Sequence, residues 1–149
     1  MKRNAGFTLI EALITLVILA IVAAIAIPSY IDYVRRGEIP DATNALSTLY
    51  VQMEQDYQDN NNYSDPNNAS QCAVGATPAA TKFFTYQCTL TNSGQNYSIT
   101  ATGDANALVS QFTYTITDQN IQSSTVPAGL SGWSNPSTNC WVTNKGGQC

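Results

Sequence analysis

The sequence FTLIEALITLVILAIVAAIAIP, residues 7–28, decides the fold of this chain, because it is almost wholly apolar and Glu11 is its only charged residue. As a helix with a rise of about 1.5 Å per residue it is roughly 30 Å long, enough to cross the hydrocarbon core of a bilayer. Lys2 and Arg3 precede it, and such cations stay on the cytoplasmic side. The stretch therefore predicts a transmembrane helix, followed by an exported domain over residues 29–149.

An ordinary secretory signal peptide, cut after Ala26, is the alternative interpretation of this stretch. A basic start and a small residue at the end are typical of such peptides. Two features do not fit. The apolar run is longer than the usual hydrophobic region, and the Glu11 carboxylate costs about 3 kcal/mol in lipid on insertion scales. An interaction that compensates for this cost is therefore expected.

The six residues GFTLIE, residues 6–11, resemble the class III signal of type IV prepilins. In that family the leader is cut after the glycine, the new N-terminal phenylalanine is N-methylated, and a glutamate stands four residues further on. The resemblance therefore implies a leader peptide over residues 1–6, cleavage after Gly6 and N-methylation of Phe7.

The resemblance is strong over residues 1–63, where Pro28, Tyr30 and Tyr33 also stand in familiar places. Beyond them it rests on the general layout and on residues 140–149, which are similar to the ending of PilE-like and ComP-like pilins. It implies a helix break at Pro28, since proline lacks an N–H group and crowds the preceding turn. In the family this region can lose helicity in the assembled filament.

The same resemblance gives Glu11 a role in assembly. Cleavage would create an amine at Phe7, one helical turn from the Glu11 carboxylate. The helix dipole also favours an anion near a helix N-terminus. In the family this glutamate is thought to meet the amine of a neighbouring subunit. A buried charge that only the correct neighbour neutralises sets the register of assembly as well as attracting the subunit.

The exported part predicts an amphipathic helix over residues 29–58. Its apolar side chains recur at three- and four-residue spacings, which places them on one face of a helix. Gly37 and Pro40 predict a second bend near its start. The apolar stripe consists of Ala42, Leu46, Leu49, Met53 and Tyr57.

Residues 59–82, rich in Asn, Asp and Pro, predict a loop. Residues 83–126 alternate between apolar and polar side chains in about four segments, which predicts an antiparallel sheet with one buried face. Residues 127–149 predict a turn-rich C-terminal region bounded by a disulfide. The expected fold class is thus α+β, with the second half of a long N-terminal helix packed on the sheet, as in the type IV pilin fold.

The four cysteines predict two disulfide bonds, because the count is even and the domain is exported. The nearest-neighbour pairing, Cys72 with Cys88 and Cys140 with Cys149, is favoured. The other two pairings stay open, since sequence alone does not settle connectivity. No C-x-x-C spacing occurs, so neither a metal site nor a cofactor is expected.

The sequence predicts no enzyme. It contains no histidine, so neither a Ser-His nor a Cys-His pair is available, and its carboxylates are few and scattered. The formal charge is −4 for the whole chain and −6 without Lys2 and Arg3. An acidic domain disfavours non-specific binding to nucleic acid, which needs clustered Lys and Arg.

The resemblance implies a structural subunit, major or minor, of a type IV pilus that supports adhesion, twitching motility or DNA uptake. Its partners would be other pilin subunits, the prepilin peptidase and the inner-membrane assembly platform. It would lie in the inner membrane as a prepilin and in an extracellular pilus after assembly. The alternatives are a specialised receptor pilin that binds DNA or a surface, and a type II secretion pseudopilin.

Overall fold

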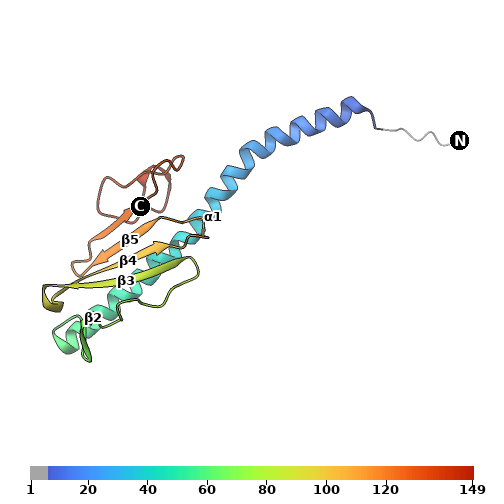
Figure 1. The fold of residues 1–149 in the computed structure, drawn as a ribbon. Coiled ribbons are helices and arrows are strands. Elements are labelled where there is room, and N and C mark those ends of the chain that lie inside the picture. Colours follow the sequence, from blue (N-terminus) through green and yellow to red (C-terminus); the bar gives the residue numbers. More distant parts are fainter. Residues whose placement is uncertain (1–6) are drawn as a thin grey trace. The chain divides into compact units, whose positions relative to one another are not determined.

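The computed structural model describes residues 7–149 as one long helix and two antiparallel sheets (Figure 1). The helix, α1, runs from Leu9 to Asn60. The chain divides into two compact units, of which the first ends at Val34 and the second spans Arg35–Cys149. This boundary lies six residues beyond the predicted one at residue 28. The reason is that Arg35 is the first buried residue of α1.

The helix α1 is continuous, so the break expected at Pro28 is not present in the single subunit. It also continues through Gly37 and Pro40, where a second interruption was expected to bend it. A proline removes one backbone hydrogen bond, and the turns on either side keep theirs. The remaining hydrogen bonds of the helix offset this local loss, and near Pro40 so does the burial of Ile39 and Ala42 in the core.

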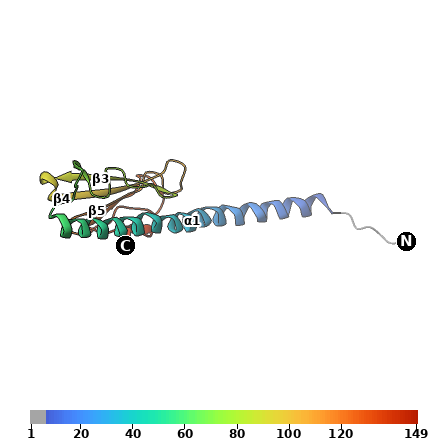
Figure 2. The ribbon, with the colours of Figure 1, turned by 90° about the horizontal axis from the view of Figure 1, so that it is seen from below.

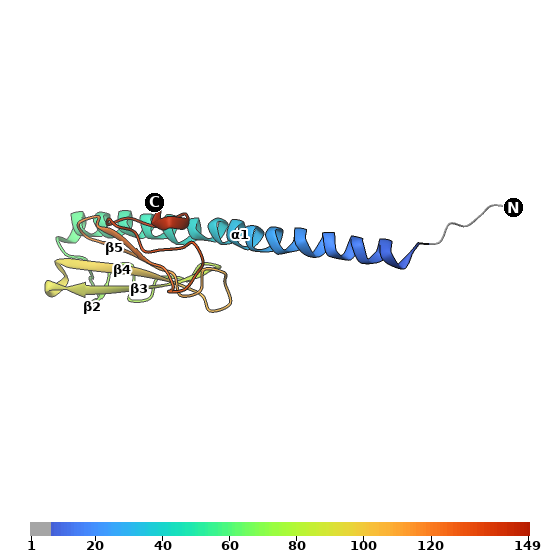
Figure 3. The same cartoon turned by 90° about the horizontal axis from the view of Figure 1, so that it is seen from above.

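The main sheet contains four antiparallel strands in the order β3-β4-β5-β6, which confirms the predicted sheet and its strand number. Each strand pairs with the next one along the chain. Figures 2 and 3 show these strands lying along the C-terminal half of α1. The strands are β3 (Phe84–Thr91), β4 (Asn96–Gly103), β5 (Thr113–Thr117) and β6 (Gln122–Thr125).

The core of the second unit lies between α1 and the inner face of the main sheet. The helix contributes Ile39, Ala42, Leu46 and Met53, all fully buried, whereas the predicted stripe residues Leu49 and Tyr57 pack at its margin. Alternate residues of each strand face this stripe, because side chains of a strand point to opposite faces in turn. The inward-facing strand residues include Phe84, Tyr86, Tyr97, Ile99, Ala101, Tyr114 and Ile116.

The predicted loop over residues 59–82 contains a small hairpin that was not predicted from the sequence. Strand β1 (Ser64–Asp65) pairs with β2 (Asn68–Cys72). The Asp65 carboxylate accepts a hydrogen bond from the backbone N–H of Asn67 at 2.7 Å, which closes the turn between them. The disulfide Cys72–Cys88 then joins β2 to β3. Few apolar residues alternate here, so the pattern resembled a loop.

The turn between β3 and β4 contains a short 3-10 helix, Asn92–Gly94, and lies against the end of α1. Gly94 has φ +80, and a Cβ atom at this position would collide with the side chain of Asn62. The Asn62 amide donates to the Ser93 carbonyl at 3.1 Å. The backbone N–H of Tyr63 donates to the Gly94 carbonyl at 2.9 Å. Glycine is therefore required here both for conformation and for space.

Candidate functional site

The start of α1 is a capping box formed by Thr8 and Glu11. The Thr8 hydroxyl accepts the backbone N–H of Glu11 at 3.3 Å, while the Glu11 carboxylate accepts the backbone N–H of Thr8 at 3.4 Å. The Thr8 hydroxyl also lies 3.2 Å from the same carboxylate oxygen. Such reciprocal bonds satisfy two donors that a helix start leaves unpaired. The T-x-x-E spacing that signals this box is present in the sequence, although the box was not among the predicted features.

The capping box changes the account of Glu11. Within one chain the carboxylate already has donors at Thr8, so it does not depend wholly on the amine of Phe7. Phe7 is exposed and lies one turn away, whereas Gly6 lies outside the described residues. The Glu11 carboxylate caps its own helix in the monomer. It can exchange its hydrogen bonds with Thr8 for an interaction with the amine of another subunit, since both interactions use the same carboxylate.

The apolar half of α1 presents a continuous hydrophobic surface around the whole helix. By length and composition it could span a membrane, and its most apolar window contains no buried residue. Leu9, Ile18 and Ile25 are all more than half exposed. A helix that is apolar all round needs lipid or other helices around it. This surface is therefore built for a hydrophobic environment that the second unit does not provide.

Three polar residues of α1, spaced three apart, hold two loops of the second unit against the helix. Arg35 Nε donates to the Leu108 carbonyl at 2.9 Å, and Glu38 accepts the backbone N–H of Val109 at 3.2 Å. The Asp41 carboxylate accepts the backbone N–H of Phe83 at 3.1 Å. Arg35 and Glu38 are 8% and 7% exposed, respectively. They fix the β4–β5 loop and the entry to β3 by hydrogen bonds to backbone groups.

The burial of these charges was not predicted from the sequence. Arg35, Glu38 and Ile39 continue the three- and four-residue spacing of the apolar stripe toward the N-terminus. That spacing could have identified them. Gly103 also supports the loop, because a Cβ atom there would collide with the Val109 carbonyl. The cation Arg35 is consequently used inside the fold, with its guanidinium 5.9 Å from the centre of the Trp133 ring.

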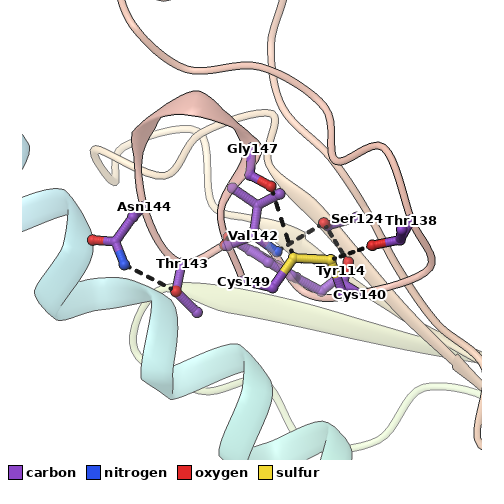
Figure 4. The surroundings of a disulfide bond; sticks show 9 residues. All are labelled: Tyr114, Ser124, Thr138, Cys140, Val142, Thr143, Asn144, Gly147 and Cys149. Atoms are coloured by element: carbon purple, nitrogen blue, oxygen red, sulfur yellow. Dashed lines mark hydrogen bonds between the residues drawn. A yellow bond between two sulfur atoms is a disulfide. The ribbon is translucent and has the colours of Figure 1, made fainter.

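The C-terminal region is closed by a disulfide and is attached to the sheet by side-chain hydrogen bonds (Figure 4). Cys140 pairs with Cys149, and together with Cys72–Cys88 this gives the two pairings that the sequence favoured. Ser124 bridges the region, since its hydroxyl donates to the Cys140 carbonyl at 2.9 Å and accepts the Val142 N–H at 3.0 Å. The Tyr114 hydroxyl donates to the Val142 carbonyl at 2.9 Å.

Within residues 7–149 no group of three or more His, Cys, Asp or Glu side chains is placed to hold a metal ion. Of the basic side chains in the second unit, Arg35 is buried and Lys82 lies over the Phe83 ring, 4.7 Å from its centre. Lys145 belongs to the short 3-10 helix Lys145–Gly147 of the C-terminal region. The strands β3–β6 themselves carry no Lys or Arg. A basic stripe along the sheet is therefore not built from the described residues.

Two family models match the chain and together span residues 1–126. The model described as "Type IV minor pilin ComP, DNA uptake sequence receptor" matches residues 28–126. The model described as "Prokaryotic N-terminal methylation motif" matches residues 1–27. The boundary between the two matches lies next to Pro28.

Similar curated proteins include fimbrial and pilin subunits of several bacteria. The type IV major pilin protein PilA of Myxococcus xanthus is 41% identical over 63 residues, which cover 42% of this chain and 29% of PilA. A fimbrial protein of Pseudomonas aeruginosa is 46% identical over 54 residues, 36% of this chain and 35% of that protein. The fimbrial protein EcpC of Eikenella corrodens is 33% identical over 97 residues, 65% of this chain and 61% of EcpC. The matches thus span about a third to three fifths of these relatives.

Among solved structures, a type IV pilin from Shewanella oneidensis is similar to this chain, with a TM-score of 0.46 and 22% sequence identity. The similarity covers 68% of this chain and 99% of that pilin.

Proposed function

We propose that this chain, which belongs to the type IV pilin family whose model describes the minor pilin ComP, is a pilus subunit assembled through the apolar half of α1. This family is one of structural pilins and not of enzymes. The subunit would be inserted in the inner membrane as a prepilin, processed, and then moved from lipid into the fibre. The prepilin peptidase and the inner-membrane assembly platform would be its partners on this route.

The observation that carries the proposal is the exposed apolar surface of residues 9–34. No residue of α1 before Arg35 is buried. Exposure of such a surface to water costs free energy, about 25 cal/mol for each square ångström of apolar area. Lipid removes this cost before assembly, and the apolar helices of other subunits remove it in the fibre. The same surface thus serves both the membrane-inserted and the assembled state.

The processing step would leave Phe7 as an N-methylated N-terminus. The match to the N-terminal methylation motif over residues 1–27 supports this part of the proposal. Cleavage would free an amine beside the Thr8–Glu11 capping box. In the fibre, this amine of one subunit would face Glu11 of the next.

Intact-mass and N-terminal analysis of fibres sheared from cells tests the proposal. The mature chain is expected to begin at Phe7 with one added methyl group, and to be present in the fibres. A Gly6→Asp variant is expected to stay uncleaved in the membrane fraction and to be missing from fibres. A mature chain that starts at Ile27 instead would mean that residues 1–26 are a discarded signal peptide.

A second candidate function is reception of DNA, favoured by the description of the family model that matches residues 28–126. The few basic residues of the second unit make a contact of many phosphates unfavourable, because each such contact needs a cation. Retention of short duplex DNA by purified fibres in 50 mM and 200 mM salt decides between a receptor and a subunit without this role. A receptor would show binding that falls steeply between the two salt concentrations.

A further inference from the structure

Two exposed tyrosines stand at the far end of the apolar span of α1. They are Tyr30 and Tyr33, whereas residues 8–29 contain no Phe, Tyr or Trp. Tyrosine is enriched where a transmembrane segment meets the membrane surface, because its apolar ring and its polar hydroxyl are stable together between acyl chains and water. Their place next to the span therefore suggests a boundary with lipid headgroups.

These two tyrosines differ from the other tyrosines of the chain, which has eight in all. Tyr30 and Tyr33 are 69% and 71% exposed, and since they are three residues apart they lie on one face of α1. The other tyrosines are buried in the core of the second unit or pack against it: Tyr50, Tyr57, Tyr63, Tyr86, Tyr97 and Tyr114. Packing within residues 7–149 therefore accounts for those six and does not account for Tyr30 or Tyr33.

The charged residues indicate the level at which the two tyrosines lie. Between Glu11 and Asp32 the chain has 20 uncharged residues, 12–31, which as a helix measure roughly 30 Å. This length equals the thickness of the hydrocarbon core, where a charged side chain is costly. Asp32 then lies at the outer edge of the core. At about 1.5 Å per residue, the backbones of Tyr30 and Tyr33 both lie within about 3 Å of this edge.

We infer that Tyr30 and Tyr33 bind the lipid headgroups of the leaflet that faces away from the cytoplasm, and that they set the depth of α1 in the membrane. Their hydroxyls can donate to the phosphate and ester oxygens of phospholipids, and their rings can pack on the first part of the acyl chains. The inference rests on the membrane-inserted state of the proposed function, and it adds to that state a named lipid contact.

The contact would also position the opposite end of the span. Phe7 lies five residues before the uncharged run, next to the cytoplasmic edge of the core. A span held at its outer end keeps the bond between Gly6 and Phe7 at a constant level, where the proposed cleavage takes place. Another subunit could also cover the tyrosines. The position favours lipid, because a contact between subunits gives no reason for tyrosines at the level where the uncharged run ends.

The first test locates the two positions in a bilayer by fluorescence quenching. The full chain is inserted at a low protein-to-lipid ratio into phosphatidylcholine–phosphatidylglycerol vesicles that carry a nitroxide either on the headgroup or in the middle of the acyl chain. Tyr30→Trp and Tyr33→Trp keep an amphipathic ring. Their added fluorescence is expected to be quenched at least about twofold more by the headgroup label than by the mid-chain label.

Two variants of α1 serve as matched controls for this measurement. Ile18→Trp lies in the middle of the uncharged run and should be quenched mainly by the mid-chain label. Val51→Trp is at a 53% exposed position of the second unit, 18 residues beyond Tyr33, and neither label should quench it. Trp133 and Trp141 contribute the same background to every variant, so each result is compared with the unmodified chain.

The second test asks whether the tyrosines set the depth. In vesicles of increasing acyl-chain length, quenching of Ile25→Trp by the headgroup label should stay nearly constant, because the span is held at the outer surface. In a chain that also carries Tyr30→Ser and Tyr33→Ser, the span should centre itself in the core instead. The same quenching should then fall at least about twofold from the thinnest to the thickest bilayer. Val51→Ser is the control and should leave it constant.

The outcomes separate this inference from the proposed function. If Ile18→Trp is quenched by the mid-chain label but Tyr30→Trp and Tyr33→Trp are not quenched, or are quenched mainly from mid-chain, the inference is overturned and membrane insertion stands. An unquenched Ile18→Trp overturns both. If the variant with two serines keeps its depth in every bilayer and is missing only from fibres, the tyrosines serve a contact between subunits, which also overturns the inference.

Discussion

The two halves of α1 show how differently one helix can be stabilised. Before Arg35 no residue is buried, and most side chains around the helix are apolar. From Arg35 onward, one stripe is buried against the sheet, and polar side chains bond to loop backbone groups. The second half therefore obtains its packing within the chain. The first half depends on lipid or on other subunits. A single mutation should thus act on the fold in one half and on assembly in the other.

The largest effect is expected at the centre of the packed half. Leu46→Ala should lower the free energy of unfolding of the second unit by about 2–5 kcal/mol, because it removes a fully buried side chain and leaves a cavity. Urea unfolding of the full chain in detergent, followed by tryptophan fluorescence, measures this, since Trp133 and Trp141 both lie in that unit. The matched control is Leu19→Ala, at an exposed position of the apolar half, which should change this value little. Equal losses in both variants would contradict the comparison.

The disulfides of the packed half should have the next largest effect. Replacing both Cys72 and Cys88 with serine opens a loop with a sequence separation of 16 and should cost about 3 kcal/mol in the chain-entropy model. The separation of Cys140 and Cys149 is 9, so its loss should cost slightly less, about 2.7 kcal/mol. The same urea experiment measures both. A larger cost for the shorter loop would show that the C-terminal region stabilises the sheet beyond its loop entropy.

In the apolar half, Glu11→Val should act on assembly and spare the fold of the second unit. Cleavage after Gly6 should persist, while entry into fibres should fall about tenfold, or ~1.4 kcal/mol, because the Phe7 amine of a neighbour loses its partner. Quantitative blotting of membrane and fibre fractions measures this. A cleaved Glu11→Val chain that enters fibres at the wild-type level would refute the pairing.

A second variant separates pairing from capping. Thr8→Val removes the hydroxyl of the capping box and retains the Glu11 charge. Loss of a cap costs about 1 kcal/mol of helix stability. If Glu11 acts on a neighbour, Thr8→Val should assemble nearly as well as the wild type. If its only role is to cap the helix, Thr8→Val and Glu11→Val should be equally defective.

A further effect is expected from alkaline pH, and only in the packed half. Burial raises the pKa of Tyr97 and Tyr114, and burial together with the hydrogen bond to Glu54 raises the pKa of Tyr63. Above pH 10 these side chains ionise first in the unfolded chain, which then binds fewer protons than the folded one. Stability should be constant in this respect below about pH 10 and fall above it, by at most about 1.4 kcal/mol per pH unit for each tyrosine.

Tyr97→Phe sharpens this prediction. Within the described residues the buried Tyr97 hydroxyl has no hydrogen-bond partner, so its removal should not lower stability at pH 7. The same variant should show a shallower fall of stability above pH 10. Urea unfolding between pH 7 and pH 11 measures both effects, and an unchanged slope would mean that Tyr97 ionises as readily in the folded chain as in the unfolded one.

Periodicity predicted those parts of the fold in which side chains repeat regularly. The alternation at Phe84, Tyr86 and Cys88 predicted β3, and the spacing of Ala42, Leu46 and Met53 predicted the face of α1 that packs on the sheet. The hairpin of β1 and β2 was not predicted, since its turn bonds and its disulfide replace a hydrophobic pattern. For the site, the T-x-x-E spacing at Thr8 and the continuation of the stripe at Arg35 were readable but were not used.

The sequence by itself determined the apolar span, the GFTLIE motif over residues 6–11 and the outward threonines of the strands, because each of these depends only on residue type and spacing. Tertiary structure decided which polar groups of α1 would be buried, since Arg35 and Glu38 obtain their partners from a loop some 70 residues away. It also decided that Thr85, Thr102, Thr113 and Thr125 stand in register across four strands. Periodicity fixes the face on which a side chain lies, and only strand pairing fixes which side chain stands beside it.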